Sequence, residues 1–198
     1  MSYFLGFSNL VVQIIFGLLI FFVMARFILQ LVRADFYNPI SQMFVKITNP
    51  MLRPLRKVVP GVFGLDMAAI VLLIILQCIE LVLTHTISGL QSIGGINLHN
   101  PVLFILEAIG TLINHAAWLY LICIFITIIM SWINPSAYQH PLVQIAVQIT
   151  NPIMRPCRKI LPPMAGIDFS PILALIIIYA VMFLVAAPLI DLPGHPRF

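Results

Sequence analysis

A segment of fourteen residues occurs twice in this chain, and no other feature constrains the fold as strongly. The first copy runs from Ile47 to Pro60 and the second from Ile149 to Pro162, 102 residues later and without a gap. Nine positions are identical, and the other five exchange one apolar residue for another, so the asparagine, the prolines and the cations are what repeats. A duplication of this kind indicates two copies of one structural unit.

The composition places both units in a membrane. Apolar residues make up 62% of the 198 residues and charged residues 8%, whereas ordinary soluble domains have about 45–50% and about 25%. Such a chain cannot cover a soluble surface with polar side chains, so we expect no nucleic-acid binding despite the net charge of +4. The three cysteines form no CxxC pair, and we expect no disulfide framework, no metal site and no cofactor. We predict an all-α integral membrane protein.

Four apolar stretches are long enough to cross a bilayer, at residues 3–32, 67–84, 102–133 and 169–187. We expect Pro188 to end the last of them. The prediction is two parallel repeats, one in residues 1–90 and one in residues 102–198. An external loop at residues 91–101 joins the repeats and contains Gly94 and Gly95. Within each repeat an arm connects the two spans, at residues 38–60 and 140–162.

Each arm is expected to begin as an amphipathic helix on the membrane surface. Asn38 followed by Pro39 is typical of a helix start, with asparagine as the N-cap. Four apolar residues then form one stripe at helical spacing, namely Ile40, Met43, Phe44 and Ile47. Ten to twelve residues are too few to span a bilayer, so this helix should lie in the interface.

The prolines of the repeated segment should break the arm. Pro50 and Pro54 each lack a backbone donor, so residues 46–59 are not expected to form one regular helix, and the second copy should behave alike. Asn49 and Asn151 are expected to cap the turn that restarts at the proline.

The cations determine the predicted orientation. The two arms hold seven of them, which are Lys46, Arg53, Arg56, Lys57, Arg155, Arg158 and Lys159. The middle loop has none, and the tail has only Arg197. Because lysine and arginine concentrate in cytoplasmic connections, both arms should be cytoplasmic and the termini periplasmic.

Three kinds of charged residue in or beside the spans have more than one interpretation. Asp66 and Asp168 stand before apolar runs and should cap them, and each could also pair with Arg53 or Arg155 of its own unit. Arg26 should extend toward the headgroups together with Arg33, or else face the bundle and contact a lipid or a partner helix. Ile128 occupies the equivalent position in the second unit.

Glu80, Glu107 and His115 lie toward the outer half of their spans. They could converge on a proton, metal or haem site, although such residues more often lie at the outer headgroup boundary.

The doubled NPxxRPxRKxxP…GxD pattern, which ends at Gly64–Asp66 and Gly166–Asp168, resembles the YggT family of bacterial inner-membrane proteins, with relatives in cyanobacteria and plastids. The resemblance implies links to osmotic stress tolerance, ion uptake, cell division and envelope organisation, and in plastid relatives to cytochrome b6 haem maturation. It implies no catalytic residues. The motif positions are candidate lipid- or partner-binding residues: Asn49, Pro50, Arg53, Pro54, Arg56, Lys57 and Asp66, and Asn151, Pro152, Arg155, Pro156, Arg158, Lys159 and Asp168.

Two classes of function remain. No GxSxG, HExxH, Walker or glycine-rich phosphate motif is present, so we expect no enzyme. The first class is an inner-membrane scaffold or assembly factor whose basic arms engage the anionic cytoplasmic leaflet, other membrane proteins or a second copy. The alternative is a channel or transport protein for ions or osmolytes, with a pore formed by a homo-oligomer.

Overall fold

The computed structural model describes residues 2–61, 64–91, 101–133, 139–162 and 168–191. All regular elements within these ranges are helices. They are α1 Ser2–Leu31, α2 Pro39–Arg56, α3 Met67–Gln91, α4 Pro101–Ile133, α5 Pro141–Ile160, α6 Ser170–Val181, the π-helix η2 Met182–Ala186 and α7 Ala187–Asp191. The sequence expectations for Gly94, Gly95, Gly166 and Arg197 lie outside the described residues.

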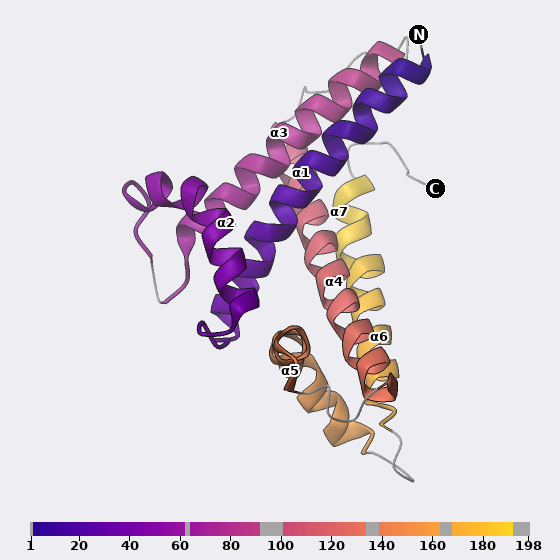
Figure 1. Ribbon diagram of the computed structural model, residues 1–198. Coiled ribbons are helices and arrows are strands. Elements are labelled where there is room, and N and C mark those ends of the chain that lie inside the picture. The colour runs from indigo at the N-terminus through magenta and orange to yellow at the C-terminus, as the bar shows by residue number, and fades with distance from the viewer. Residues whose placement is uncertain (1, 62–63, 92–100, 134–138, 163–167, 192–198) are drawn as a thin grey trace.

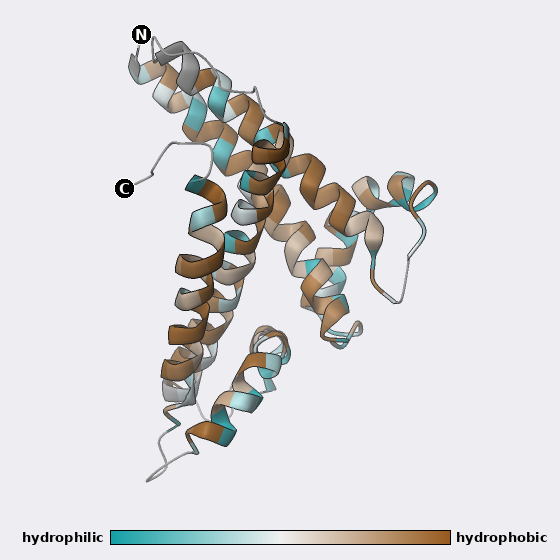
Figure 2. Cartoon of the chain, turned by 180° about the vertical axis from the view of Figure 1, so that it is seen from behind, coloured by the Kyte–Doolittle hydropathy of each residue, from teal (hydrophilic) through white to brown (hydrophobic). Residues whose placement is uncertain are grey.

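The prediction of four apolar helices is confirmed. The segments long and apolar enough to cross a membrane are Tyr3–Leu31, Met67–Ile87, Pro101–Ser131 and Ser170–Asp191. Figure 2 shows that they are hydrophobic over most of their length, with hydrophilic residues concentrated in the arms and near a few helix ends. Large apolar side chains remain exposed along these helices, as a lipid-facing surface requires.

The four long helices form two antiparallel pairs. α1 packs against α3, and α4 packs against the continuous helix made of α6, η2 and α7. In Figure 1 the pairs meet in the upper half of the view and diverge toward the lower half, where α2 and α5 lie. The starts of α1 and α4 therefore lie toward one end of the molecule and the two arms toward the other, as expected for two units in the same orientation.

The arms differ from the sequence expectation because each is one continuous helix. α2 contains Pro50 and Pro54, and α5 contains Pro152 and Pro156. All four prolines are exposed. Two prolines four residues apart share one helix face, so the carbonyl groups that they leave without an N–H donor lie on the outer side, within reach of water or headgroups. The prolines bend the arm without breaking it, and Figures 1 and 2 both show α5 changing direction between its two halves.

The arm starts as predicted, but its apolar stripe is divided. The amide of Ile40 donates to Asn38 Oδ1 at 2.9 Å, so Asn38 is the N-cap of α2. Phe44 is buried, whereas Met43 and Ile47 are each 42% exposed. Only part of the stripe packs on the protein, because α2 turns Thr48 and Leu52 inward as well. The remaining apolar side chains are available to the membrane.

Pro188 does not end the fourth span, contrary to expectation. The turn before it is a π-helix, in which the amide of Ala187 donates to the carbonyl of Met182, five residues back. A π-turn accommodates one extra residue and shifts the register of the hydrogen bonds, so a residue without an N–H can follow it. α7 then continues to Asp191.

Candidate functional site

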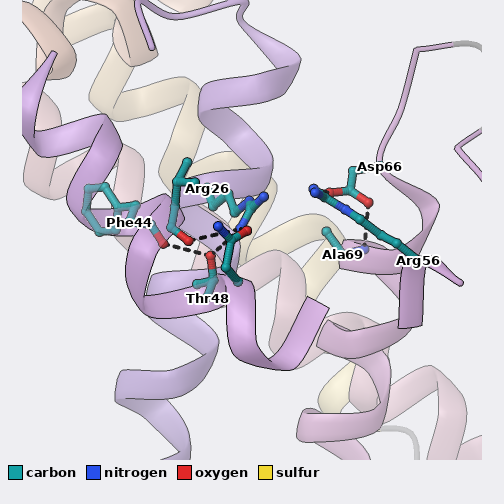
Figure 3. A network of polar contacts seen from close by, with 8 residues as sticks. Arg26, Phe44, Thr48, Arg56, Asp66 and Ala69 are labelled. Atoms are coloured by element: carbon teal, nitrogen blue, oxygen red, sulfur yellow. Dashed lines mark hydrogen bonds and ion pairs between the residues drawn. The ribbon is translucent and has the colours of Figure 1, made fainter. Parts of the chain in front are cut away.

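An arginine–aspartate pair joins each arm to the span that follows it. Arg56 bonds to the carboxylate of Asp66 (Figure 3), and Arg158 Nε donates to Asp168 Oδ2 at 3.0 Å. The two pairs occupy equivalent positions in the two units, 102 residues apart. The two units thus share an arginine–aspartate contact as well as a sequence motif.

The predicted pairing of the aspartates with Arg53 and Arg155 is wrong. Both arginines are exposed, and the aspartates bond to arginines three residues further along. The prediction assumed a broken arm. Because the helix continues through the motif, Arg56 is the last residue of α2 and lies nearer to the start of the next span than Arg53, one turn earlier.

The aspartates also act on the first turns of α3 and α6. The amide of Ala69 donates to Asp66 Oδ1 at 3.3 Å, which confirms the N-cap role predicted for Asp66. The prediction is wrong for Asp168, because the N-cap residue of α6 is Phe169. Asp168 lies two residues before α6, where its Oδ1 accepts from the amide of Ser170 at 2.9 Å and from the Ser170 hydroxyl at 2.5 Å. Burial alone would raise the pKa of Asp168, but the bonds from Ser170 and Arg158 outweigh it, and the pKa lies below its usual value.

Arg26 is buried inside the chain and does not extend to the headgroups. It is 6% exposed, and its Nη1 donates to Thr48 Oγ1 at 2.7 Å, to Asn49 Oδ1 at 2.9 Å and to the carbonyl of Val45 at 3.3 Å. Figure 3 shows the guanidinium between the two helices, while Thr48 itself donates to the carbonyl of Phe44. The bundle-facing interpretation therefore holds, and the helix that Arg26 contacts belongs to the same chain.

Asn49 does not cap a restarted turn, because α2 is continuous at this point and the Asn49 side chain instead accepts from Arg26. The second unit has Ile128 in place of Arg26, and Asn151 is half-buried. Only the first arm is therefore held to its first span by an arginine.

The cations that are not used in these pairs face outward. We define the basic arm surface as the exposed cations of α2 and α5 and their C-terminal ends that bond to no aspartate, namely Lys46, Arg53, Lys57, Arg155 and Lys159. Exposed apolar side chains accompany them, with Val58 81% exposed and Ile160 69% exposed. The opposite side of each arm packs on the protein, mainly through apolar residues such as Leu52, Met154 and Cys157, and buries Thr48 and Thr150 as well. This is the pattern of a helix lying in a membrane interface.

A second candidate site is a polar cavity between α1, α3 and α4. Its volume is about 280 Å³, and it is lined by Asn9, Gln13, Gln77, Glu80, Leu81, Thr84, His85 and Thr111. Gln77 Nε2 donates to Glu80 Oε2 at 3.0 Å. Close by, His85 Nε2 lies 3.2 Å from Glu107 Oε1.

The structure brings together two of the three residues for which convergence was considered. Glu80 lines the cavity, and Glu107 lies beside it through His85, a cavity-lining residue. His115 does not line the cavity, and its Nδ1 lies 2.8 Å from the carbonyl of Thr111 on its own helix. Within the described residues, no group of three or more His, Cys, Asp or Glu side chains could hold a metal ion.

Sequence reasoning missed several cavity residues, chiefly Asn9, Gln13, Thr84 and His85. Each is a single polar residue in or beside an apolar span, which predicts little by itself. One signal was available: Asn9 and Gln13 stand in the first unit where Thr111 and His115 stand in the second. Polar residues at equivalent positions of both units would have pointed to a common depth in the membrane.

Comparison with known families identifies the repeated unit. The sequence matches the CCB3/YggT family in two segments, residues 5–87 and 106–189. Each segment contains one arm between two apolar helices. The chain belongs to the CCB3/YggT family. Two matches within one chain also show that this CCB3/YggT protein consists of two repeats.

Several relatives are similar in sequence to this CCB3/YggT protein. The chain is 36% identical to an uncharacterized protein of Pseudomonas aeruginosa, over 94% of this chain and 92% of the relative. It is also 36% identical to the uncharacterized protein YggT of Escherichia coli K12, over 79% of this chain and 77% of the relative. The protein ycf19 of Guillardia theta is 36% identical over 34% of this chain and 75% of its own length, the extent of about one repeat. No solved structure matches the chain.

Proposed function

We propose that this protein is a non-enzymatic scaffold or assembly factor of the bacterial inner membrane. Its two arms bind phosphate-bearing anionic headgroups of the cytoplasmic leaflet. The arms and the bound lipid together form a surface that binds other membrane proteins or a second copy. The observation that carries the proposal is the basic arm surface, in which all five cations are exposed and, within the part of the chain that the structure describes, none bonds to an aspartate.

The chemistry of the arms supports this ligand. A basic side chain near an anionic leaflet contributes about 1 kcal/mol of attraction, so the five cations together supply several kcal/mol. Exposed apolar residues of the same arms, such as Val58 and Ile160, add burial among the acyl chains. Bound lipid would therefore contact both kinds of side chain.

The aspartate pairs support a rigid platform. Arg56 and Arg158 join their arms to α3 and α6 through Asp66 and Asp168, and Arg26 holds the first arm to α1. With these arginines engaged, the first arm is bonded to α1 and at the start of α3, and the second arm is bonded near the start of α6. A scaffold needs arms in a fixed orientation, because a partner must meet the same surface each time.

The conduit alternative draws support from the polar cavity, but the bundle core opposes it. Between the level of Gln77 and that of Arg26, the facing sides of α1 and α3 are buried and apolar, at Ile20, Val23, Leu73 and Leu76. These four side chains provide no polar path for an ion from the cavity to the arms. In the scaffold proposal, reconstituted protein carries no ion flux. Flux that is abolished by Glu80→Ala would favour the conduit.

Lipid binding by the arms can be tested by thermal unfolding in detergent with added lipid. The variant combines Arg53→Glu, Lys57→Glu, Arg155→Glu and Lys159→Glu, and its matched control exchanges lysine and arginine at the same four positions. We expect phosphatidylglycerol to raise the Tm of wild type and control more than phosphatidylcholine does, and this difference to be lost in the variant. The gain should also decrease with added salt. Equal stabilisation of the variant and the control would contradict the proposal.

The cytoplasmic location of the arms has its own test. A cysteine introduced at Lys57 should react with a membrane-impermeant maleimide only after the inner membrane is opened. The test uses a Cys78→Ser background, because Cys78 is half-buried, whereas Cys123 and Cys157 are buried. Labelling in intact spheroplasts would place the arms on the periplasmic side and contradict the proposed orientation.

A further inference from the structure

The polar cavity has an unusual place in an otherwise apolar bundle. It is lined by residues near the start of α1, toward the end of α3 and in the first half of α4. Figure 2 shows hydrophilic segments in this upper part of the molecule, away from the arms. Polar side chains inside a membrane protein carry a free-energy cost, so each of their hydrogen-bonding groups needs a partner.

Two oxygen atoms of the cavity residues have no partner within the described residues. Gln77 is fully buried, and because its Nε2 donates to the carboxylate of Glu80, its Oε1 is left without a donor. A carboxylate oxygen accepts and does not donate, which determines the orientation of this amide. The Oδ1 of Asn9 is buried and without a donor as well. Leaving a buried acceptor unpaired costs about 1–3 kcal/mol.

The hydroxyl groups of the cavity do not supply the missing donors. Thr84 donates to the carbonyl of Leu81 at 3.1 Å, and Thr111 donates to the carbonyl of Glu107 at 2.8 Å. Each hydroxyl proton is therefore used within its own helix, and only the oxygen remains available to a ligand. The oxygens of the lining thus all accept, while the amide NH2 groups of Asn9 and Gln13 are donors in the same wall.

We propose that this cavity binds a partly hydrated monovalent alkali cation, Na⁺ or K⁺. Neutral oxygens with a single lining carboxylate, that of Glu80, suit a hard cation of low charge. The volume of about 280 Å³ exceeds the share of one water in the liquid, about 30 Å³, by enough to hold the ion with several waters. A divalent ion bound by protein ligands would require more carboxylates in a tighter cage. The cation contacts the two unpaired oxygens, and it does so independently of lipid binding at the arms.

The test compares the Tm of the purified full-length protein in KCl, NaCl and N-methyl-D-glucamine chloride at equal ionic strength. N-methyl-D-glucamine carries the same charge but is too large to enter as a coordinated ion. We expect KCl or NaCl to raise the Tm in a saturable way. Gln77→Leu, which removes an unpaired oxygen at similar volume, should raise the apparent Kd at least tenfold. Gln42→Leu makes the same chemical change at an exposed position of α2 and should bind like wild type.

A second variant keeps the proposal testable if Gln77→Leu does not fold. Thr111→Val keeps the shape of the side chain, removes a lining oxygen and should also weaken binding. Saturable stabilisation that is equal for wild type and Thr111→Val would overturn the proposal. Equal Tm values of the wild type in all three salts would overturn it too, since the cavity would then hold water only. Loss of cation binding with unchanged lipid stabilisation would leave the scaffold proposal intact.

Discussion

The two repeated aspartates show how one sequence position acquires two environments. The side chain of Asp66 is 6% exposed and that of Asp168 is 34% exposed. Ser170, two residues after Asp168, donates to the carboxylate from both its amide and its hydroxyl. The equivalent residue in the first unit is Ala68. The more exposed carboxylate of Asp168 is thus held by bonds from Ser170, whereas that of Asp66 is enclosed by the surrounding protein.

The lowered pKa of Asp168 predicts a pH-dependent effect of Ser170→Ala. A group whose folded-state pKa lies below its unfolded value stabilises the fold above the unfolded pKa, here about 3.8, and loses this contribution as pH falls through the folded-state pKa. Removing the hydroxyl should cost about 1 kcal/mol at pH 7, toward the low side of hydrogen bonds to charged groups because Asp168 is partly exposed.

The free energy of unfolding in mixed micelles, measured from pH 7 to pH 3, checks this prediction. The difference between wild type and Ser170→Ala should shrink below about pH 4. Ser8→Ala is a suitable control, because the Ser8 hydroxyl donates to an uncharged group, the carbonyl of Phe4 on its own helix. A difference that stays constant over the whole range would show that the hydroxyl does not act through the carboxylate.

At the scale of elements, one glycine sets how closely α4 approaches the end of the fourth span. A Cβ atom added to Gly110 would lie 2.7 Å from Leu189 Cβ and 3.0 Å from the carbonyl oxygen of Ala186. Both atoms belong to or adjoin the backbone, so they cannot turn away. The contact lies where η2 passes into α7, and close helix approach through small residues is typical of membrane bundles.

We predict opposite effects for two glycine substitutions. Gly110→Ala should destabilise the protein by about 1–3 kcal/mol, because the overpacked helices must separate. Gly17→Ala should stabilise it by up to about 1 kcal/mol, since alanine favours the helix and nothing lies within 4 Å of the new Cβ. The free energies of unfolding in mixed micelles measure both effects. Equal changes in the two variants would contradict the close contact at Gly110.

At the scale of the whole molecule, the two units meet where α4 packs on α1 and α3, and also near the start of each arm. Asn38 is 4% exposed, and its Nδ2 donates to the carbonyl of Pro141 at 2.9 Å. The amide of Asp35 donates to Gln148 Oε1 at 2.9 Å. Asn38 and Pro141 occupy nearly equivalent places in the two units, as is expected for residues close to a pseudo-twofold axis. Figure 1 shows α5 in the space between the two diverging helix pairs.

Two substitutions at Asn38 separate its roles in capping and in joining the units. Asn38→Ser keeps a capping oxygen but is too short to reach Pro141, so it should cost about 0.5–1.5 kcal/mol. Asn38→Ala loses both roles and should cost about 1 kcal/mol more. Pulsed EPR between spin labels on the two arms should show a broader distance distribution in both variants. His140→Ser changes the equivalent cap of α5 and should leave the distances unchanged; broadening there as well would assign the effect to capping.

The sequence alone determined the features that depend on local preference and on repetition. The four apolar spans, the two units, the N-cap at Asn38 and the capping role of Asp66 were all predicted, because hydrophobic length and capping chemistry are properties of a few neighbouring residues. The 102-residue offset then required that the second unit repeat the architecture of the first.

The tertiary structure decided which polar groups meet. Arg26 contacts α2, Arg56 in place of Arg53 pairs with Asp66, and Glu80 shares a cavity with residues of α1 and α4. These contacts depend on the rotation of each helix toward its neighbours, which a mostly apolar sequence does not encode in its periodicity. The arms and the last span stay helical through their prolines because the released carbonyls lie on exposed faces or a π-turn precedes the proline, and both conditions follow from packing.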